Sequence, residues 1–211
     1  MTPSLCFCRR FEGTMITIEA IDAALAHHHP VTLDDRTIVP AAVSCILRSD
    51  GAGLQMLFIE RSSHEADPWS GNLGFPGGKM EEGDATLQQT AERETREEVG
   101  IDLSRARYLG RVSDVGGTRF RVRVACFVYA VERPVELRLS EEVKDAFWIS
   151  LDALLDPSLH RIVPVRFDDR SFIRPAFTAV PAGKPPLWGL TYRLVTLFLE
   201  VLRSEIKDRG L

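Results

Sequence analysis

The sequence predicts an α/β fold in which a mixed β-sheet lies between helices. Segments with the periodicity of helices are interspersed with short apolar, β-branched runs, and the two kinds alternate in a mixed order. The chain has 211 residues and 45% of them are apolar, which is enough to bury one sizeable core. Neither a second domain nor an internal repeat is visible, so we expect one domain with appendages.

The N-terminal segment, residues 1–35, is predicted to be a tail with a short helix, and residues 36–211 are predicted to be a single domain. The helix should stop before Pro30. Three apolar residues at helical spacing define its buried side: Ile18, Ile21 and Leu25. The run His27-His28-His29 could bind metal, although the end of a solvated helix is the simpler interpretation.

The strands are predicted from apolar runs between turn signals. Residues 38–48 and 54–60 form two such runs, and Asp50-Gly51 between them is a hairpin signal. Three later runs are also predicted strands: 108–115, 120–130 and 146–150. The first two of these are separated at Gly116-Gly117. An amphipathic helix is predicted near the C-terminus from the spacing of Leu190, Leu194, Leu197, Phe198 and Val201.

The most informative segment is a glycine-containing turn that leads into a helix rich in carboxylates. Asp84 can cap the helix by accepting backbone N–H groups and Gly100 can end it, which predicts a helix over residues 85–99. Residues four apart form its packing stripe: Leu87, Ala91, Thr95 and Val99. Three carboxylates share one turn of a neighbouring face, at positions i, i+3 and i+4: Glu94, Glu97 and Glu98.

Like charges one helical turn apart repel each other, so a cation should offset these carboxylates. Arg93 and Arg96 could do part of this, and a solvated, mixed-charge helix face is the simpler alternative. The glycines favour a metal site. Mg²⁺ takes hard oxygen ligands and shares its coordination between one or two carboxylates, waters and substrate phosphates. A turned backbone carbonyl near Gly78, beside the glutamates, would provide such a partial cage.

This segment resembles the box of the Nudix hydrolases, written G-x5-E-x7-R-E-U-x-E-E-x-G-U with U aliphatic. The matching residues are Gly78, Arg93, Glu94, Glu97, Glu98, Gly100 and Ile101. The chain departs from the pattern at three points: Thr95 replaces an aliphatic residue, Asp84 replaces the first glutamate, and eight residues instead of seven separate Asp84 from Arg93. The resemblance implies a Nudix-type α/β/α sandwich with a mixed sheet, and a diphosphohydrolase activity.

Other features are similar to the coenzyme A diphosphatase branch of that family. They are the lengthened box with aspartate, the preceding Phe75-Pro76-Gly77-Gly78, and Trp188-Gly189-Leu190-Thr191. A Leu-Arg-x-His-x-Gly stretch usual in that branch is replaced here by residues 65–71, which lack the His and the Arg. The resemblance implies as substrate a nucleoside diphosphate linked to another moiety, with coenzyme A or acyl-CoA as the leading case. The alternatives are ADP-ribose, dinucleotides or nucleoside triphosphates, or a non-catalytic Nudix-like module that senses a ligand.

The resemblance also implies roles for individual residues. The metal ligands would be Glu94, Glu97, Glu98 and the carbonyl of Gly78, and the metal would be Mg²⁺ or Mn²⁺. Arg93 would orient a ligating glutamate without touching the metal. The catalytic residues would be Glu97, Glu98, Arg93 and Glu142, with the general base coming either from the box, as Glu98, or from a later loop, as Glu142. An ordinary exposed acid is the alternative for Glu142.

Three arginines and Trp69 are candidates for contact with the substrate. Arg119, Arg121 and Arg123 alternate with apolar residues, which places three guanidiniums on one strand face where they could bind phosphates. The alternative is a solvated sheet face. Trp69 could stack on a base or pack its own loop, and Trp188 is interpreted as a core residue.

Composition narrows the partners and the location. With 26 basic and 30 acidic residues the net charge is −4, so no basic field attracts nucleic acid or an anionic membrane. No apolar run reaches the ~18 residues of a membrane span. The four cysteines form neither a disulfide framework nor a zinc pattern, so we expect a reducing, cytoplasmic location. The expected partner is a small-molecule nucleotide substrate, and a homodimer is a possible assembly.

Overall fold

The computed structural model describes residues 16–33, 38–63, 69–117, 121–132, 135–167 and 170–208. Of residues 206–208 it describes only the backbone. The helices are α1 (Ile18–His27), α2 (Leu87–Val99), α3 (Leu151–Leu155) and α4 (Gly189–Asp208), and two short 3-10 turns span Leu103–Arg105 and Pro157–Leu159. The strands are β1 (Val39–Ser49), β2 (Leu54–Arg61), β3 (Leu73–Gly74), β4 (Gly77–Lys79), β5 (Arg107–Gly117), β6 (Val122–Val131), β7 (Val143–Ser150), β8 (His160–Phe167), β9 (Arg170–Phe177) and β10 (Leu187–Trp188).

The main sheet is mixed, as the sequence predicts. Its strand order is β3-β2-β1-β6-β5, with β4 paired to β1 and β7 paired to β2. Strands β1 and β6 run parallel, from Val39 opposite Val122 to Arg48 opposite Val131. The other pairs in this sheet are antiparallel. A second, three-stranded sheet has the order β10-β9-β8.

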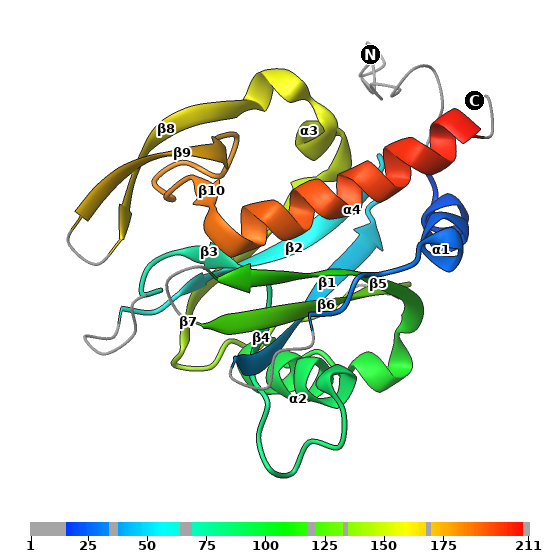
Figure 1. Cartoon of the computed structure of the whole chain (residues 1–211), viewed down its shortest axis with the longest axis horizontal. Coiled ribbons are helices and arrows are strands. Elements are labelled where there is room, and N and C mark those ends of the chain that lie inside the picture. The colour runs from blue at the N-terminus through cyan, green and yellow to red at the C-terminus, as the bar shows by residue number, and fades with distance from the viewer. Residues whose placement is uncertain are drawn as a thin grey trace, which may run out of the picture.

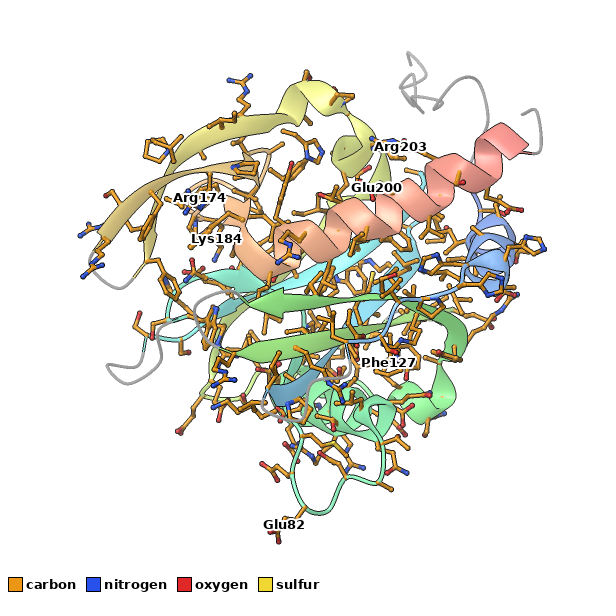
Figure 2. The ribbon with its side chains drawn as sticks, viewed as in Figure 1. Glu82, Phe127, Arg174, Lys184, Glu200 and Arg203 are labelled. Atoms are coloured by element: carbon orange, nitrogen blue, oxygen red, sulfur yellow. The ribbon has the colours of Figure 1, made fainter. Side chains whose placement is uncertain are left out.

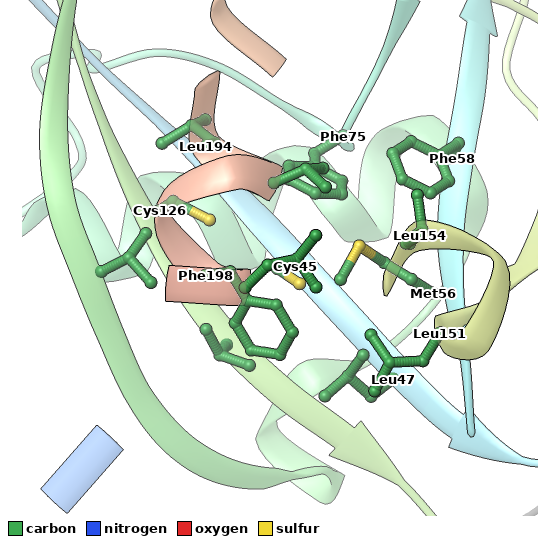
Figure 3. Close-up of a cluster of buried hydrophobic side chains, with 14 of the residues drawn as sticks. Cys45, Leu47, Met56, Phe58, Phe75, Cys126, Leu151, Leu154, Leu194 and Phe198 are labelled. Carbon is green, nitrogen blue, oxygen red and sulfur yellow. The ribbon is translucent and has the colours of Figure 1, made fainter. Parts of the chain in front are cut away.

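The sheet lies between two layers of helices, so the predicted α/β/α sandwich is confirmed. Alternate residues of β1 face opposite cores: Cys45 and Leu47 pack with α1, α3 and α4, whereas Ala42 and Ile46 pack with α2. Figure 1 shows α4 along one side of the sheet and α2 on the other. The larger core is drawn in Figure 3, where Cys45 and Cys126 lie among apolar side chains and neither is disulfide-bonded.

The two N-terminal predictions on local structure are confirmed. Helix α1 starts after Thr17, whose side chain accepts from the N–H of Ala20 at 3.2 Å, and it ends at His27. In the β1–β2 turn, Asp50 Oδ1 accepts from two successive backbone N–H groups at 2.9 and 3.0 Å, and Gly51 supplies the left-handed φ of 85°. The buried face of α1 joins the larger core, and the predicted boundary near residue 35 stays a prediction.

The sequence interpretation missed the hairpin formed by β8 (His160–Phe167) and β9 (Arg170–Phe177). Most side chains of this hairpin are exposed, including Ile162 and Ile173, so an apolar alternation does not mark it. Pro164 also argues against a strand, although an edge strand tolerates it. Within the described residues, no helix is long and apolar enough to cross a membrane.

Candidate active site

Helix α2 starts two residues later than predicted, and Asp84 is not its cap. Thr86 is the capping residue, with its hydroxyl accepting from the N–H of Gln89 at 3.2 Å. The helix ends as predicted at Gly100, which has φ 75°. Asp84 is unavailable because its carboxylate accepts from the N–H of Glu81 and the hydroxyl of Thr90, both at 3.0 Å, and binds Arg93.

Arg93 is the centre of a partly buried ionic network. Its Nε and Nη2 atoms donate to the two oxygens of Asp84 at 3.0 and 2.9 Å. Its Nη1 atom donates to both Glu94 Oε1 and Glu97 Oε2, each at 3.0 Å. The paired guanidinium holds the pKa of the Asp84 carboxyl well below its usual range. In this lengthened box Asp84 therefore holds Arg93 in place. Arg93 in turn holds Glu94 and Glu97, two of the predicted metal ligands.

Glu98 is 3% exposed, which corrects the expectation that all three glutamates lie away from the packing side of the helix. Its Oε2 accepts from the N–H of Gly77 at 2.8 Å and its Oε1 accepts from Arg61 Nη1 at 3.3 Å. Burial raises the pKa of Glu98 to about 7, although the Gly77 hydrogen bond and the Arg61 charge act in the opposite direction. The charges of Glu94 and Glu142 raise this pKa further.

The Phe75-Pro76-Gly77-Gly78 segment builds the other wall of the site. Phe75 is buried and stacks on Phe58, with ring centroids 5.1 Å apart. Gly77 and Gly78 pair with β1 as strand β4. A Cβ atom on Gly78 would lie 2.4 Å from Glu94 Oε1, so only glycine leaves room for the carboxylate there. Burial is the main cause that raises the pKa of Glu94.

Glu142 is exposed, and the fold brings it to the same site. Its carbonyl accepts from the N–H of Ser62 at 2.8 Å, which fixes the loop before β7 against the end of β2. The charge of Glu142 raises the pKa of both Glu94 and Glu98, so its carboxylate is within electrostatic range of both. The structure therefore places Glu98 and Glu94 against Gly77 and Gly78, links Glu97 to Glu94 through Arg93, and keeps Glu142 within electrostatic range, while their roles stay predictions.

The donor set suits a divalent cation of the hard, oxygen-preferring kind. In the part of the chain that the structure describes, no three acidic, histidine or cysteine side chains converge closely enough to hold a metal as they stand. One guanidinium nitrogen instead bridges Glu94 and Glu97. The second oxygens of these two glutamates have no partner among the described residues, and Glu97 is exposed, so these oxygens are available to an ion.

The candidates for substrate contact have different outcomes. Arg119 lies outside the described residues. Arg121 is exposed just before β6. The guanidinium of Arg123 donates to the carbonyl of Leu33, so for this residue the alternative of a solvated sheet face is wrong. Trp69 meets Phe167 edge to face at 6.2 Å. Trp188, interpreted from sequence as core, is half-buried and lines a cavity with Trp69.

Two residues of the site were missed by sequence reasoning. Arg61 contacts Glu98 from the last position of β2, and Asn72 accepts from Trp188 Nε1 at 2.9 Å. The sequence did contain a signal for Arg61, because it is a charged residue at the end of a buried apolar strand. Functional residues are often found where such strands lead into loops. Asn72 had none, since its role depends on a residue more than a hundred positions away.

Comparison with known proteins agrees with this geometry. The pattern of the Nudix domain matches residues 39–171. The chain belongs to the Nudix family. Its residues 39–171 contain the sheet, the carboxylate helix and Glu142, while α1 and α4 lie outside the match. A solved MutT/Nudix family protein from Enterococcus faecalis has the same fold, with a TM-score of 0.51 at 16% identity over 91% of this chain and 74% of that one.

Several curated proteins are similar in sequence. Mouse mitochondrial coenzyme A diphosphatase NUDT8 is 30% identical over 75% of this chain and 74% of its own length. The uncharacterized protein C14C4.10c of Schizosaccharomyces pombe is 40% identical over 48% of this chain, and the probable Nudix hydrolase C6G9.05 of the same organism is 25% identical over 75%. The matches cover 33% and 54% of these two yeast proteins.

Proposed function

We propose that this protein is a metal-dependent hydrolase of nucleoside diphosphates linked to another moiety, with coenzyme A or acyl-CoA as the leading substrate. The observation that carries the proposal is the placement of Glu94 and Glu98 against the Gly77–Gly78 turn, with Arg93 holding Glu94 and Glu97 together. Support for coenzyme A comes from the similarity to mouse NUDT8 and to a peroxisomal coenzyme A diphosphatase of Caenorhabditis elegans, which is 30% identical over 57% of this chain.

Enzymes of this family generally use divalent metal ions. Glu94, Glu97 and Glu98 are the residues that would hold Mg²⁺ or Mn²⁺ here, beside the carbonyl of Gly78. Such an ion neutralises phosphate charge and lowers the pKa of bound water. Arg93 holds one oxygen of Glu94 and one of Glu97, so both carboxylates are fixed and the second oxygen of each would bind the ion. The anchor for this arrangement is Asp84, which binds Arg93 through two further hydrogen bonds.

The structure favours Glu142 over Glu98 as the general base. Glu98 is almost fully buried, and both of its oxygens already accept hydrogen bonds. Glu142 is exposed and lies within electrostatic range of Glu94 and Glu98, so it can take a proton from an attacking water that arrives from solvent. Attack at one phosphorus breaks the bond to the bridging oxygen and releases the other phosphorus as a phosphate ester.

Hydrolysis of a substrate panel tests the proposal. With coenzyme A and Mg²⁺ we expect phosphopantetheine and adenosine 3′,5′-bisphosphate, identified by mass spectrometry. Chelation should abolish the reaction. Turnover of ADP-ribose or nucleoside triphosphates with coenzyme A untouched would contradict the substrate and leave the hydrolase. Binding of these compounds without turnover of any would contradict the hydrolase and favour a ligand-sensing module.

Two further expectations stay proposals. A homodimer has no support among the observations above, and the cytoplasmic location is an inference from the cysteines alone. The names of the mouse and nematode relatives place those proteins in mitochondria and peroxisomes.

A further inference from the structure

A cavity of about 390 Å³ lies where the β8–β9 hairpin meets β3 and the first turns of α4. Aromatic and basic side chains dominate its lining, which includes Trp69, Phe167, Phe172, Arg174 and Trp188. Figure 2 shows Arg174 on the hairpin, close to the start of α4. The cavity is of the size that takes one small organic group, since ligand pockets span roughly 300–1,000 Å³.

The rings of the cavity are held in a connected row. Phe167 meets Trp69 edge to face at 6.2 Å with an interplanar angle of 65°, and meets Trp188 at 5.8 Å with an angle of 83°. Trp188 is also fixed from its other end, because its Nε1 donates to Asn72 Oδ1 at 2.9 Å. Edge-to-face packing leaves Trp188 at least one ring face that Phe167 does not cover. The cavity thus offers pre-positioned aromatic surface.

Polar groups accompany the rings. Asn72 accepts from Trp188 through its carbonyl oxygen, which leaves its amide nitrogen as a donor. The guanidinium of Arg174 lies 5.3 Å from the centroid of Phe172, and Arg193 donates to the carbonyl of Gly116 at 2.7 Å. A saturated acyl chain would use none of these groups. A flat heterocycle with ring nitrogens and a neighbouring phosphate would use the rings, the amide and a guanidinium together.

The cavity is joined to the carboxylate site through the end of β2. The carbonyl of Asn72 accepts from the N–H of Arg61 at 3.1 Å, and the side chain of Arg61 contacts Glu98. Two adjoining residues therefore connect the wall of the cavity to the most buried acid of the site.

We propose that this cavity binds the nucleobase of the substrate, stacked on Trp188, with Arg174 beside the nucleoside phosphate. The proposal deepens the function proposed above and rests on it for the choice of a nucleotide. It assigns the remaining part of the substrate to the other side of the carboxylates. It also gives Trp188 and Arg174 a role in recognition that the Nudix box does not contain.

Tryptophan fluorescence tests this without metal or hydrolysis. The chain has three tryptophans, and Trp148 lies outside the cavity under the guanidinium of Arg48, 4.0 Å from the ring centroid. Titration of the full chain with adenosine 5′-monophosphate should quench fluorescence saturably in the wild type and in the Trp148→Phe control. Ribose 5-phosphate, which lacks the base, should not. Trp188→Ala should weaken adenosine monophosphate binding about tenfold or more.

Two measurements guard against a Trp188 variant that fails to fold. Arg174→Ala removes an exposed side chain and should weaken binding several-fold, whereas Arg161→Ala, an exposed arginine of β8 outside the cavity lining, should not. Photolabelling of the unmodified chain with 8-azidoadenosine monophosphate should mark the segments that line the cavity, which are residues 69–73, 116–117, Phe167 and 172–193. Labelling elsewhere, tighter binding of octanoate than of the nucleotide, or unchanged affinity in Arg174→Ala would overturn the proposal. Loss of hydrolysis with binding intact would overturn only the proposed function.

Discussion

Replacing Gly78 by alanine should disable the site without unfolding the chain. The added Cβ would lie 2.4 Å from Glu94 Oε1 and 2.5 Å from Glu94 Cδ, whereas real Cβ atoms essentially never approach within 3.0 Å. The carboxylate therefore has to move by about 0.6–1 Å. A misplacement of about 1 Å in a catalytic constellation can lower the rate about 100-fold. The melting temperature should change little, because the displaced atoms end a flexible side chain.

Gly77→Ala is the matched control, because a Cβ at this neighbouring glycine would clash with main-chain atoms and should lower stability, which Gly78→Ala should not. Gly77 has φ 150°, and a Cβ there would lie 2.3 Å from the carbonyl oxygen of Ala42 and 2.5 Å from the Cα of Val43. Main-chain atoms of a central strand cannot swing aside. We expect a loss of about 2–4 kcal/mol in the free energy of unfolding, which lowers the melting temperature by about 4–16 °C in a chain of this size.

A double-mutant cycle decides whether Gly78 acts through Glu94. Initial rates of coenzyme A hydrolysis with Mg²⁺ should fall about 100-fold for Gly78→Ala in the wild type and should not fall further in a Glu94→Ala background. Melts by circular dichroism accompany each rate. A Gly78→Ala rate within twofold of wild type, or equal losses in both backgrounds, would refute the reasoning.

Three further predictions follow from the site. Glu97→Gln and Glu98→Gln should each abolish the metal-dependent hydrolysis, and Glu97→Gln, at an exposed position, should melt within a few degrees of wild type. Survival of activity in both variants or after chelation would contradict the ligand assignment. Glu142→Gln should lower kcat far more than it changes KM if it is the base, and an unchanged kcat would return that role to Glu98. Asp84→Asn should cost about 2 kcal/mol of stability near pH 7. Since the folded pKa of Asp84 is depressed, this difference should hold above the unfolded pKa near 3.9 and shrink below about pH 4, and a pH-independent gap in melting temperature would count against the ion pair.

The parts of the fold that were predictable are those buried on a regular period. Strand β1 carries apolar residues on both faces because helices cover both, and such a run stands out in the sequence. The β8–β9 hairpin does not, since Ile162 and Ile173 are exposed at 74% and 60% and no core face imposes alternation. Helical spacing correctly grouped Glu94, Glu97 and Glu98, yet it could not show which of them is buried.

The burial of Glu98 and the reassignment of Asp84 both come from tertiary contacts. Glu98 lies four residues after Glu94, and only the approach of the Gly77 turn and of Arg61 makes that position an interior one. Asp84 has the residue type of a helix cap, but the fold places Arg93 where it binds Asp84 through two nitrogens, and Thr86 caps instead. Thr95 is likewise satisfied in the core, because its hydroxyl lies 2.7 Å from the carbonyl of Ala91.

The end of β2 explains how features on opposite faces of the sheet can serve one substrate. Glu60, 3% exposed, accepts from Lys144 Nζ and Lys184 Nζ at 2.6 Å each, whereas the next residue, Arg61, reaches Glu98. Successive side chains of a strand point to opposite faces, and the β2–β7 register shifts at this step, as it does at bulges that re-aim side chains near active sites. Lys184 comes from the loop between β9 and β10, and Pro175 and Trp188 on either side of that loop line the aromatic cavity. Glu60 thus holds the loop beside the cavity on one face of the sheet, and Arg61 contacts the buried Glu98 on the other. Because both residues belong to the end of β2, this strand end sets the separation between the cavity and the carboxylate helix.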